Sequence, residues 1–157
     1  MAKSLNRFKS YCQSVNFDPE IRRFDGGTKT AQSAAEALNV SVDTIIKSLI
    51  FLAGSEPIVV LMSGDKRVSV EKLSKVLGVS STLVNKADAD TARIETGYAV
   101  GGIPPFGHLK KLRTFMDVSL TSKPLCFLAA GTPDSLFEIS AEKLLELSNA
   151  EVADLKG

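Results

Sequence analysis

Cysteine and histidine are scarce in this sequence, and their scarcity excludes several kinds of site. The 157 residues include two cysteines, Cys12 and Cys126, and a single histidine, His108. A structural zinc site needs about four such ligands, commonly with a C-x-x-C spacing that is absent here. We therefore expect two reduced thiols in the core, no metal and no cofactor.

Long apolar runs and an excess of one charge are also missing. No run approaches the ~20 apolar residues that a membrane helix needs, and residues 1–16 lack the apolar stretch of a signal peptide. The 19 basic and 18 acidic residues leave a net charge of +1. Bulk electrostatic binding of nucleic acid normally comes with a basic excess, so only a local basic patch remains open. We expect a cytoplasmic protein with no membrane partner.

Short helices and short strands alternate along the chain without a regular βαβ rhythm. Apolar spacing and capping residues predict helices over 4–15, from Thr28 or Thr30 into the alanine-rich segment, over 70–78, over 88–96 and over 141–147. Apolar and β-branched runs predict strands over 20–25, 45–54, 58–62, 98–100, 113–117, 125–130 and 135–140. This order predicts one α+β domain over residues 1–157, with a mixed sheet.

A lysine inside the most apolar predicted strand is the first candidate for function. Lys47 stands in "IIKSLIFLAG". Burial of an unpartnered lysine is unfavourable, so its ammonium must reach water or a negative group. A snorkelling lysine at a strand end is one interpretation. A lysine that emerges into a pocket, where it binds phosphate or carboxylate or holds a substrate carbonyl, is the other.

The stretch "GYAVGGIPPFGHLKK" at 97–111 has an unusually specialised backbone. Gly101 and Gly102 permit close approach of a ligand, and Pro104 and Pro105 stiffen the chain after them. Successive free N–H groups in such a loop can form an anion nest or an oxyanion hole. A structural corner is the alternative. The stretch matches neither G-x-G-x-x-G nor the P-loop.

His108 and two threonines are weaker candidates. His108 could act as a general base, but no nucleophile motif accompanies it, so a histidine that pins the loop is the alternative. Thr28 and Thr30 precede the alanine-rich helix, whose first N–H groups could bind an anion. Helix capping is the alternative for both threonines.

Two basic clusters could meet a phosphate-bearing substrate. Lys110 and Lys111 follow the glycine loop, and Lys66 and Arg67 follow the "SGD" turn. Such clusters are usually solvated surface, but the first adjoins the loop. A substrate that approaches this loop would therefore find positive charge beside it.

The order of these segments resembles a known family. "TAQSAAEALNVSVDTIIKSLIF", "SGDKRVSVEKLSKVLG", "ADADTARIETGYAVGGIPPFGH" and a strand at "FEIS" together resemble the YbaK/proline-tRNA-synthetase-associated editing domain, over roughly residues 20–155. Its members are freestanding or synthetase-fused deacylases that hydrolyse the ester between a wrong amino acid and a transfer RNA, commonly that for proline. The family fold is a mixed, partly closed sheet surrounded by helices.

The resemblance implies a role for each candidate. The strand lysine tied to activity in the family is Lys47, and the family's glycine loop falls on Gly101, Gly102, Pro104 and Gly107. The implied catalytic groups are Lys47, Gly101 and Gly102; the implied substrate-binding residues are Thr28, Thr30, Ile103, Pro104, Phe106, Gly107 and His108; the implied tRNA-binding residues are Lys66, Arg67, Lys110 and Lys111. The ribose hydroxyl or a substrate thiol would assist. The implied partner is the acceptor end of a mischarged tRNA, and an aminoacyl-tRNA synthetase is a further candidate.

This sequence departs from the family pattern at two points. The identity of the amino acid that is removed therefore stays open among cysteine, alanine and similar small residues. Members that clear cysteine often carry another polar residue where His108 stands, and members that clear alanine usually vary the double glycine. A non-catalytic module that binds tRNA, aminoacyl-adenosine or a synthetase is the main alternative, which turnover would distinguish. A hydrolase of small esters or amides is the second, and insensitivity to salt would favour it.

Overall fold

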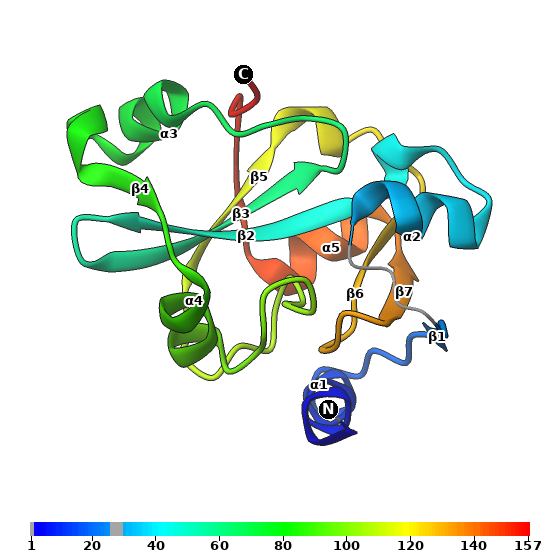
Figure 1. Cartoon of the computed structure of the whole chain (residues 1–157). Helices are drawn as coiled ribbons and strands as arrows, with labels where there is room; N and C mark the ends of the chain where they lie inside the picture. The colour runs from blue at the N-terminus through cyan, green and yellow to red at the C-terminus, as the bar shows by residue number, and fades with distance from the viewer. Residues whose placement is uncertain (1, 26–29) are drawn as a thin grey trace.

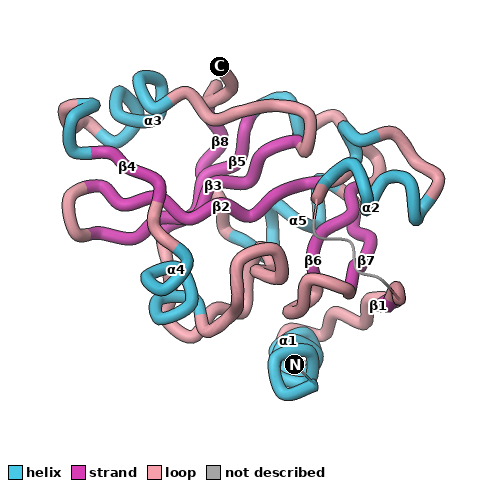
Figure 2. Tube along the Cα trace, in the orientation of Figure 1, coloured by secondary structure: helices cyan, strands magenta, loops and turns pink. Residues whose placement is uncertain are grey.

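The chain folds into two β-sheets with helices packed around them (Figures 1 and 2). The computed structural model describes residues 2–25 and 30–157. Its helices are α1 Ala2–Ser14, α2 Ala31–Leu38, α3 Val70–Leu77, α4 Ala89–Thr96 and α5 Ala141–Ser148. Its strands are β1 Ile21–Arg23, β2 Ile46–Ala53, β3 Glu56–Ser63, β4 Val84–Lys86, β5 Arg113–Asp117, β6 Cys126–Ala129, β7 Ser135–Ile139 and β8 Glu151–Ala153. The expected α+β class is confirmed. None of the described helices is long and apolar enough to cross a membrane.

The larger sheet is mixed, with strand order β4-β2-β3-β5-β8. β2 and β3 form the predicted antiparallel hairpin and pair along their whole length, whereas β5 and β8 join in parallel. β4 pairs only with the second half of β2, from Phe51 to Ala53. The first half of β2 therefore has no β4 partner on that side.

The centre of this sheet is buried on both faces. Residues Ile58 to Met62 of β3 are all 0% exposed. Val59 and Leu61 face a core shared with α1 and α5, while Ile58 and Met62 face the core below α3. A strand covered on both sides is apolar at successive positions, which explains the unbroken run in the sequence.

The smaller sheet is antiparallel, with order β1-β7-β6. A parallel bridge joins Ile45, just before β2, to Phe127 of β6. α2 covers this junction, because Ala34 and Ala35 pack against Ile45 and Phe127. The mixed, partly closed sheet is thus built as two sheets that are bridged at one end.

The predicted helix boundaries are largely confirmed. The side chains of Thr30, Ser69 and Ser140 each accept a hydrogen bond from the backbone N–H three residues later, as N-caps do. Gly78 and Gly97 end α3 and α4 in the left-handed conformation, with φ of 73° and 83°.

The predicted strand over Tyr98–Val100 is wrong. Gly97 turns the chain, and the Tyr98 N–H is taken by the Thr96 hydroxyl at 3.1 Å instead of a neighbouring strand. A turn follows at once, closed by the Gly102 N–H on the Ala99 carbonyl at 2.9 Å. The three-residue strands β4 and β8 were not predicted, because so short a segment carries no periodic signal.

Both cysteines are buried and unpaired, as predicted. Burial raises the pKa of the Cys12 thiol to about 12 and that of Cys126 to about 11. Both are protonated at neutral pH and are poor nucleophiles.

Candidate functional site

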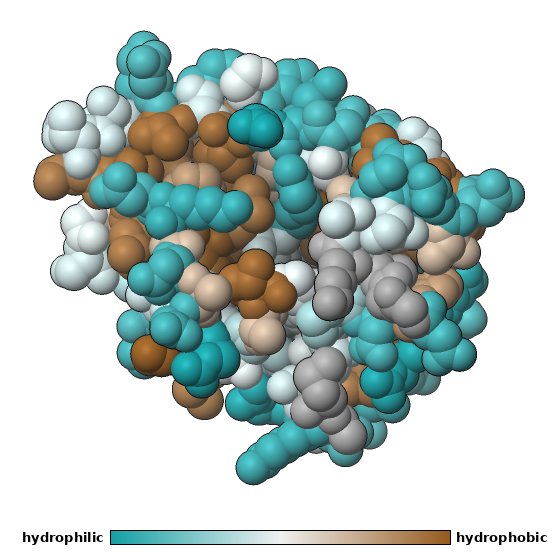
Figure 3. Space-filling model, viewed as in Figure 1, coloured by the Kyte–Doolittle hydropathy of each residue, from teal (hydrophilic) through white to brown (hydrophobic). Residues whose placement is uncertain are grey.

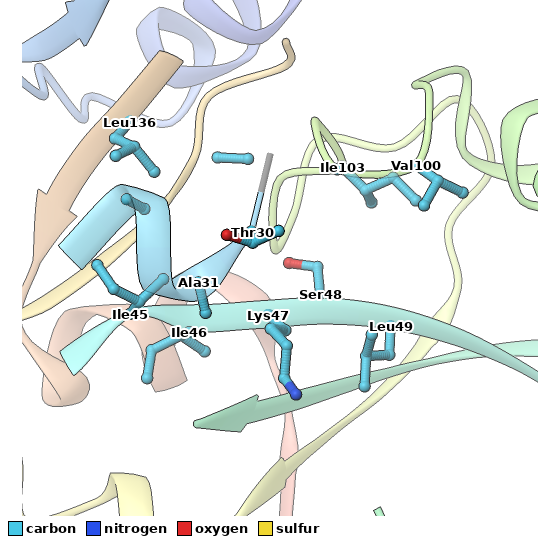
Figure 4. A pocket seen from close by; sticks show the side chains of 13 residues that line it. Thr30, Ala31, Ile45, Ile46, Lys47, Ser48, Leu49, Val100, Ile103 and Leu136 are labelled. Atoms are coloured by element: carbon cyan, nitrogen blue, oxygen red, sulfur yellow. The ribbon is translucent and has the colours of Figure 1, made fainter. Parts of the chain in front are cut away.

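A small cavity lies where the two sheets separate beyond the bridge between Ile45 and Phe127 (Figure 4). Its volume is about 240 Å³. It is lined by Thr30, Ala31, Ala34, Ile45, Ile46, Lys47, Ser48, Leu49, Val100, Gly101, Ile103, Ala129 and Leu136. These residues come from α2, β2, the glycine loop and the smaller sheet. The space suits a small chemical group, since pockets for drug-sized ligands start near ~300 Å³.

The open edge of β2 forms one wall of this cavity. The N–H of Ala87 donates to the carbonyl of Ile50 at 2.9 Å, so the backbone groups of Ile50 point toward β4. Backbone direction alternates along an antiparallel strand, so the N–H and carbonyl of Ser48 point the same way. Because β4 pairs only from Phe51 onward, Ser48 presents these groups at an unpaired edge.

The side chain of Ser48 points into the cavity. Figure 4 shows its hydroxyl on the same side of β2 as Thr30 and Ile103. Within residues 2–25 and 30–157, Ser48 Oγ is the buried side-chain oxygen or nitrogen that has no hydrogen-bond partner. Buried polar atoms are almost always paired in folded proteins, so this exception asks for an explanation.

Lys47 leaves β2 on the opposite side of the strand (Figure 4). Its ammonium donates a hydrogen bond to the backbone carbonyl of Lys66 at 2.8 Å. Burial lowers the pKa of Lys47, and the nearby charges of Lys86 and Arg67 lower it further, against a smaller opposing effect of Asp65. The aliphatic stem of Lys47 therefore borders the cavity, while the ammonium of Lys47 lies on the other side of β2.

Three cations gather on this other side. Lys86 is the cross-strand neighbour of Phe51, so its side chain shares the face that holds Lys47. Arg67 follows β3 and lies close enough to act on the charge of Lys47. We call Lys47, Arg67 and Lys86 the basic face. In Figure 3, hydrophilic side chains cross an apolar surface in the region of β2, β3 and α3.

The N-terminus of α2 forms another wall of the cavity. Thr30 Oγ1 accepts from the Ser33 N–H at 3.0 Å and caps the helix. The N–H groups of Ala31 and Gln32 have no partner within the helix, as is general for a first turn. The first turn of α2 packs closely against Gly64, just after β3. A Cβ at that position would lie 2.6 Å from the Ala31 Cβ, so only glycine fits there without a shift.

The two glycines of the loop differ in what they do. Gly101 is exposed, has φ of +91° and lines the cavity, and its N–H has no hydrogen bond among the described residues. The N–H of Gly102 is already bound to the Ala99 carbonyl. A Cβ at Gly102 would lie 2.7 Å from the carbonyl carbon of Thr132. Gly102 therefore lets the loop pack against the β6–β7 connection, while Gly101 offers the free donor.

The rest of the loop, from Pro104 to His108, is fixed by contacts outside the cavity. His108 Nε2 lies 2.7 Å from the Pro104 carbonyl. Burial lowers the pKa of His108, which the hydrogen bond to Pro104 only partly opposes, so the neutral ring donates this bond. Phe106 packs among Phe8, Tyr11, Phe17 and Phe137. None of Pro104, Phe106, Gly107 and His108 lines the cavity in the described chain.

The predicted tRNA-binding residues fall in two places. Arg67 lies beside Lys47, as does the backbone of Lys66, whose ammonium is 3.6 Å from Asp65. Lys110 and Lys111 line a separate groove of about 880 Å³. The ammonium of Lys110 forms an ion pair with Glu95 at 2.9 Å. Thr28 lies outside the described residues.

Sequence reasoning missed Ser48, Lys86 and the cavity residues of the smaller sheet, Ala129 and Leu136. The alternation of β2 could have placed Ser48 opposite Lys47. Lys86 stands on an unpredicted strand, so no signal connected it with Lys47. No group of three metal-ligating side chains occurs in the part of the chain that the structure describes.

Comparison with known proteins gives concordant matches. Residues 25–147 match the family profile described as the aminoacyl-tRNA editing domain. A crystal structure of a proposed trans-editing enzyme for prolyl tRNA synthetase superposes with a TM-score of 0.91 at 33% identity, covering 98% of this chain and 97% of that one. YwhH of Bacillus subtilis is 27% identical over 150 residues, covering 95% of this chain and 94% of YwhH. EbsC of Enterococcus faecalis, named as a proposed Cys-tRNA(Pro)/Cys-tRNA(Cys) deacylase, is 26% identical over 127 residues, covering 80% of this chain and 76% of EbsC.

Proposed function

Because the chain belongs to the aminoacyl-tRNA editing domain family, we propose that it is a trans-acting deacylase of mischarged tRNA. It hydrolyses the ester between a small, wrong amino acid and the terminal ribose of a tRNA, commonly the one for proline. One observation carries the proposal. A small, mostly apolar cavity and a basic face meet across the free edge of β2 at Ser48.

This arrangement suits the two halves of an aminoacyl-tRNA. The amino-acid side chain enters the cavity beside Ile103 and Leu136. The terminal ribose and phosphates lie on the basic face, where Lys47, Arg67 and Lys86 supply positive charge. The ester then crosses the strand edge and lies next to the free N–H of Gly101.

Hydrolysis of the ester needs few catalytic groups from the protein. Water adds to the ester carbonyl carbon, the bond from that carbon to the ribose oxygen breaks, and the ribose oxygen takes up a proton. Free amino acid and intact tRNA leave. Negative charge develops on the carbonyl oxygen, and the Gly101 N–H and the Lys47 ammonium stabilise it. Loss of one such donor typically slows a reaction by about 100- to 1,000-fold.

The proton on water has a source of assistance in the substrate. No carboxylate, imidazole or thiol lines the cavity among the described residues. The neighbouring ribose hydroxyl can accept that proton while it passes its own proton to the departing ribose oxygen, and a cysteinyl substrate can accept it as the thiolate, when the ester is held in place. The pocket accordingly acts by positioning and by electrostatic stabilisation, with no metal or cofactor in the step.

The remaining basic residues extend the contact with RNA. Lys66 continues the basic face, while Lys110 and Lys111 in the second groove meet the backbone further along the acceptor stem. A synthetase that captures the released RNA is a further partner in this proposal.

Release of amino acid from mischarged tRNA tests the proposal. The panel consists of alanyl, cysteinyl, seryl and threonyl forms of the proline tRNA, with prolyl-tRNA as the control. We expect fast hydrolysis of at least one wrong species, and a loss of about 100-fold or more in Lys47→Ala. Binding of the panel without release of amino acid would instead favour a recognition module. Full activity in Lys47→Ala would contradict the role of that residue.

A further inference from the structure

The free hydroxyl of Ser48 is a specificity element that the deacylation chemistry does not use. Its oxygen is buried and unpaired among the described residues, and it points into the cavity (Figure 4). The other hydroxyl of the lining, that of Thr30, is engaged in the capping box of α2 with Ser33. Of the two hydroxyl-bearing residues that line the cavity in the described part of the chain, Ser48 is therefore the one whose hydroxyl is available to a ligand.

The surroundings of this hydroxyl are apolar. Ala31, Ala34, Ile45, Ile103, Ala129 and Leu136 all contribute to the same lining. Ser48 Oγ is already buried without a partner among the described residues, and an apolar ligand that fills this space leaves it unpaired. A ligand with a hydroxyl at this point pairs with it. A site that is built to bind a substrate hydroxyl rejects the analogue that lacks it.

We propose that Ser48 hydrogen-bonds the side chain of the aminoacyl group and makes the cavity selective for small amino acids that carry a hydroxyl. This inference rests on the proposed deacylase function and names its substrate class. Seryl and threonyl esters are the preferred substrates, and alanyl and 2-aminobutyryl esters, which differ only by the missing oxygen, are the disfavoured ones. The cavity of about 240 Å³ limits the class to small side chains.

The position of Ser48 separates recognition from chemistry. Its side chain and that of Lys47 leave opposite faces of β2. The ester crosses the edge between them, so the Ser48 hydroxyl reaches the amino-acid side chain and not the ribose. Removal of this hydroxyl should change the choice of substrate while the reaction itself continues.

The test uses the full chain and four forms of the proline tRNA, arranged as matched pairs. Seryl is compared with alanyl, and threonyl with 2-aminobutyryl, by single-turnover hydrolysis. We expect the wild type to favour the hydroxyl-bearing member of each pair by about tenfold or more. Ser48→Ala should reduce both ratios to near one, mainly by slowing the seryl and threonyl species.

A matched control is Ser74→Ala. Ser74 is a buried serine of α3 whose hydroxyl is paired with the Glu71 carbonyl at 2.8 Å, away from the cavity. The Ser74→Ala variant should keep both wild-type ratios and should have a lower melting temperature, because a hydrogen bond of the fold is lost. Ser48→Ala should not lower the melting temperature, because no hydrogen bond of the fold is lost. A marked fall would show that the hydroxyl serves the fold, against the proposal.

The outcomes separate the two levels of the proposal. If the wild type hydrolyses none of the four species, the inference about Ser48 is overturned, and the cysteinyl form of the proline tRNA then decides the proposed function: its hydrolysis keeps the deacylase function, and its stability overturns that function as well. If it hydrolyses them and Ser48→Ala keeps the wild-type ratios, only the inference about Ser48 is overturned. An equal loss on all four species would assign Ser48 to the ester and also overturn it.

Discussion

At position 47 a positive charge stands beside two others of the same sign. Arg67 and Lys86 both lower the pKa of Lys47, adding to the effect of its burial. A fold gains nothing from such a cluster, because like charges repel and burial disfavours each of them. An anionic ligand relieves the repulsion, which is why we place the phosphate-bearing acceptor end of the proposed substrate on the basic face.

Removal of one of these cations should raise the pKa of Lys47. In Lys86→Ala the repulsion from Lys86 disappears while that from Arg67 remains, so the ammonium holds its proton to higher pH. Titration of the Lys47 side chain by NMR with ¹³C-labelled lysine measures this directly. If deacylation needs the charged lysine, the rate should fall at alkaline pH as Lys47 loses its proton. In Lys86→Ala this fall, corrected for spontaneous hydrolysis of the ester, should move to higher pH.

Lys75→Ala is the control for this measurement. Lys75 is an exposed lysine of α3 that has no part in the pKa shift of Lys47. The prediction fails if the Lys47 titration is unmoved in Lys86→Ala, or if both variants move it equally.

Single residues also show what the sequence can and cannot reveal. Lys47 is recognisable because a charge within an apolar strand is unusual. Ser48 is not, because serine is common in strands and its importance depends on a missing partner that only packing reveals. Gly101 and Gly102 look alike in the sequence, yet among the described residues the N–H of Gly101 has no hydrogen bond, whereas Gly102 makes a close backbone contact.

At the scale of elements, the glycine loop depends on close packing against the β6–β7 connection. Gly102→Ala would put a Cβ 2.7 Å from a backbone carbon of Thr132, so one of the two segments must move. We expect a loss of roughly 1–3 kcal/mol in the free energy of unfolding. Deacylation should also slow, because Gly101 is displaced with the loop.

Gly54→Ala is the comparison for that variant. Gly54 has φ of +63° in the β2–β3 turn, and a Cβ there would meet no atom within 4 Å. The backbone conformation alone should lower stability by about 1 kcal/mol, with no effect on deacylation. Urea unfolding and single-turnover hydrolysis of both variants provide the measurements. Normal activity in Gly102→Ala would contradict the supporting role of this contact.

The same loop should make stability depend on pH through His108. Burial lowers the pKa of His108 in the folded state, so the unfolded state binds the proton more readily. The stabilisation is complete above the unfolded pKa of about 6.5 and declines as the pH falls below it. His108 is the only histidine of the chain. Urea unfolding between about pH 7.5 and 5 therefore reports largely on this residue.

His108→Gln removes the titrating group and can still donate a hydrogen bond. Its unfolding free energy should be nearly constant over the same pH range. A wild-type curve that is equally flat would show that the imidazole is not held neutral in the loop.

Elements with their own local signal were predictable from the sequence, and those defined by their neighbours were not. α3 was found with both ends, from Ser69 to Gly78, because its caps and its periodicity agree. β4 was missed because its three residues become a strand only by pairing with β2. The incomplete coverage of β2 by β4, which opens the cavity, was hidden for the same reason.

At the scale of the whole molecule, Asp117 ties the C-terminal segment to the central sheet. It is 0% exposed and accepts hydrogen bonds from the N–H groups of Leu155 and Lys156 at 2.8 and 3.1 Å. Burial alone would raise its pKa, but these bonds and those from Ser119 outweigh burial and lower it. Its stabilisation is present above the unfolded pKa of about 3.9 and is lost as the pH falls through the lower folded pKa.

Asp117→Asn should therefore lower the unfolding free energy at pH 7 by about 2 kcal/mol or more, since charge-assisted bonds are lost. Asp154→Asn is the matched control, because Asp154 forms an exposed ion pair with Lys72 at 3.1 Å, worth at most about 1 kcal/mol. Both values come from urea unfolding. Equal effects of the two variants would contradict the assigned role of Asp117.

The central claim is that an aminoacyl ester lies across the free edge of β2, with its side chain in the cavity and its nucleotide on the basic face. A crystal structure with adenosine that carries a seryl amide at the 3′ position, which cannot be hydrolysed as an ester, tests this most directly. We predict the seryl side chain within hydrogen-bond distance of Ser48 Oγ, the amide carbonyl beside the Gly101 N–H, and the adenosine near Lys47. Binding in the groove of Lys110 and Lys111, with the cavity of Ser48 unfilled, would contradict the claim.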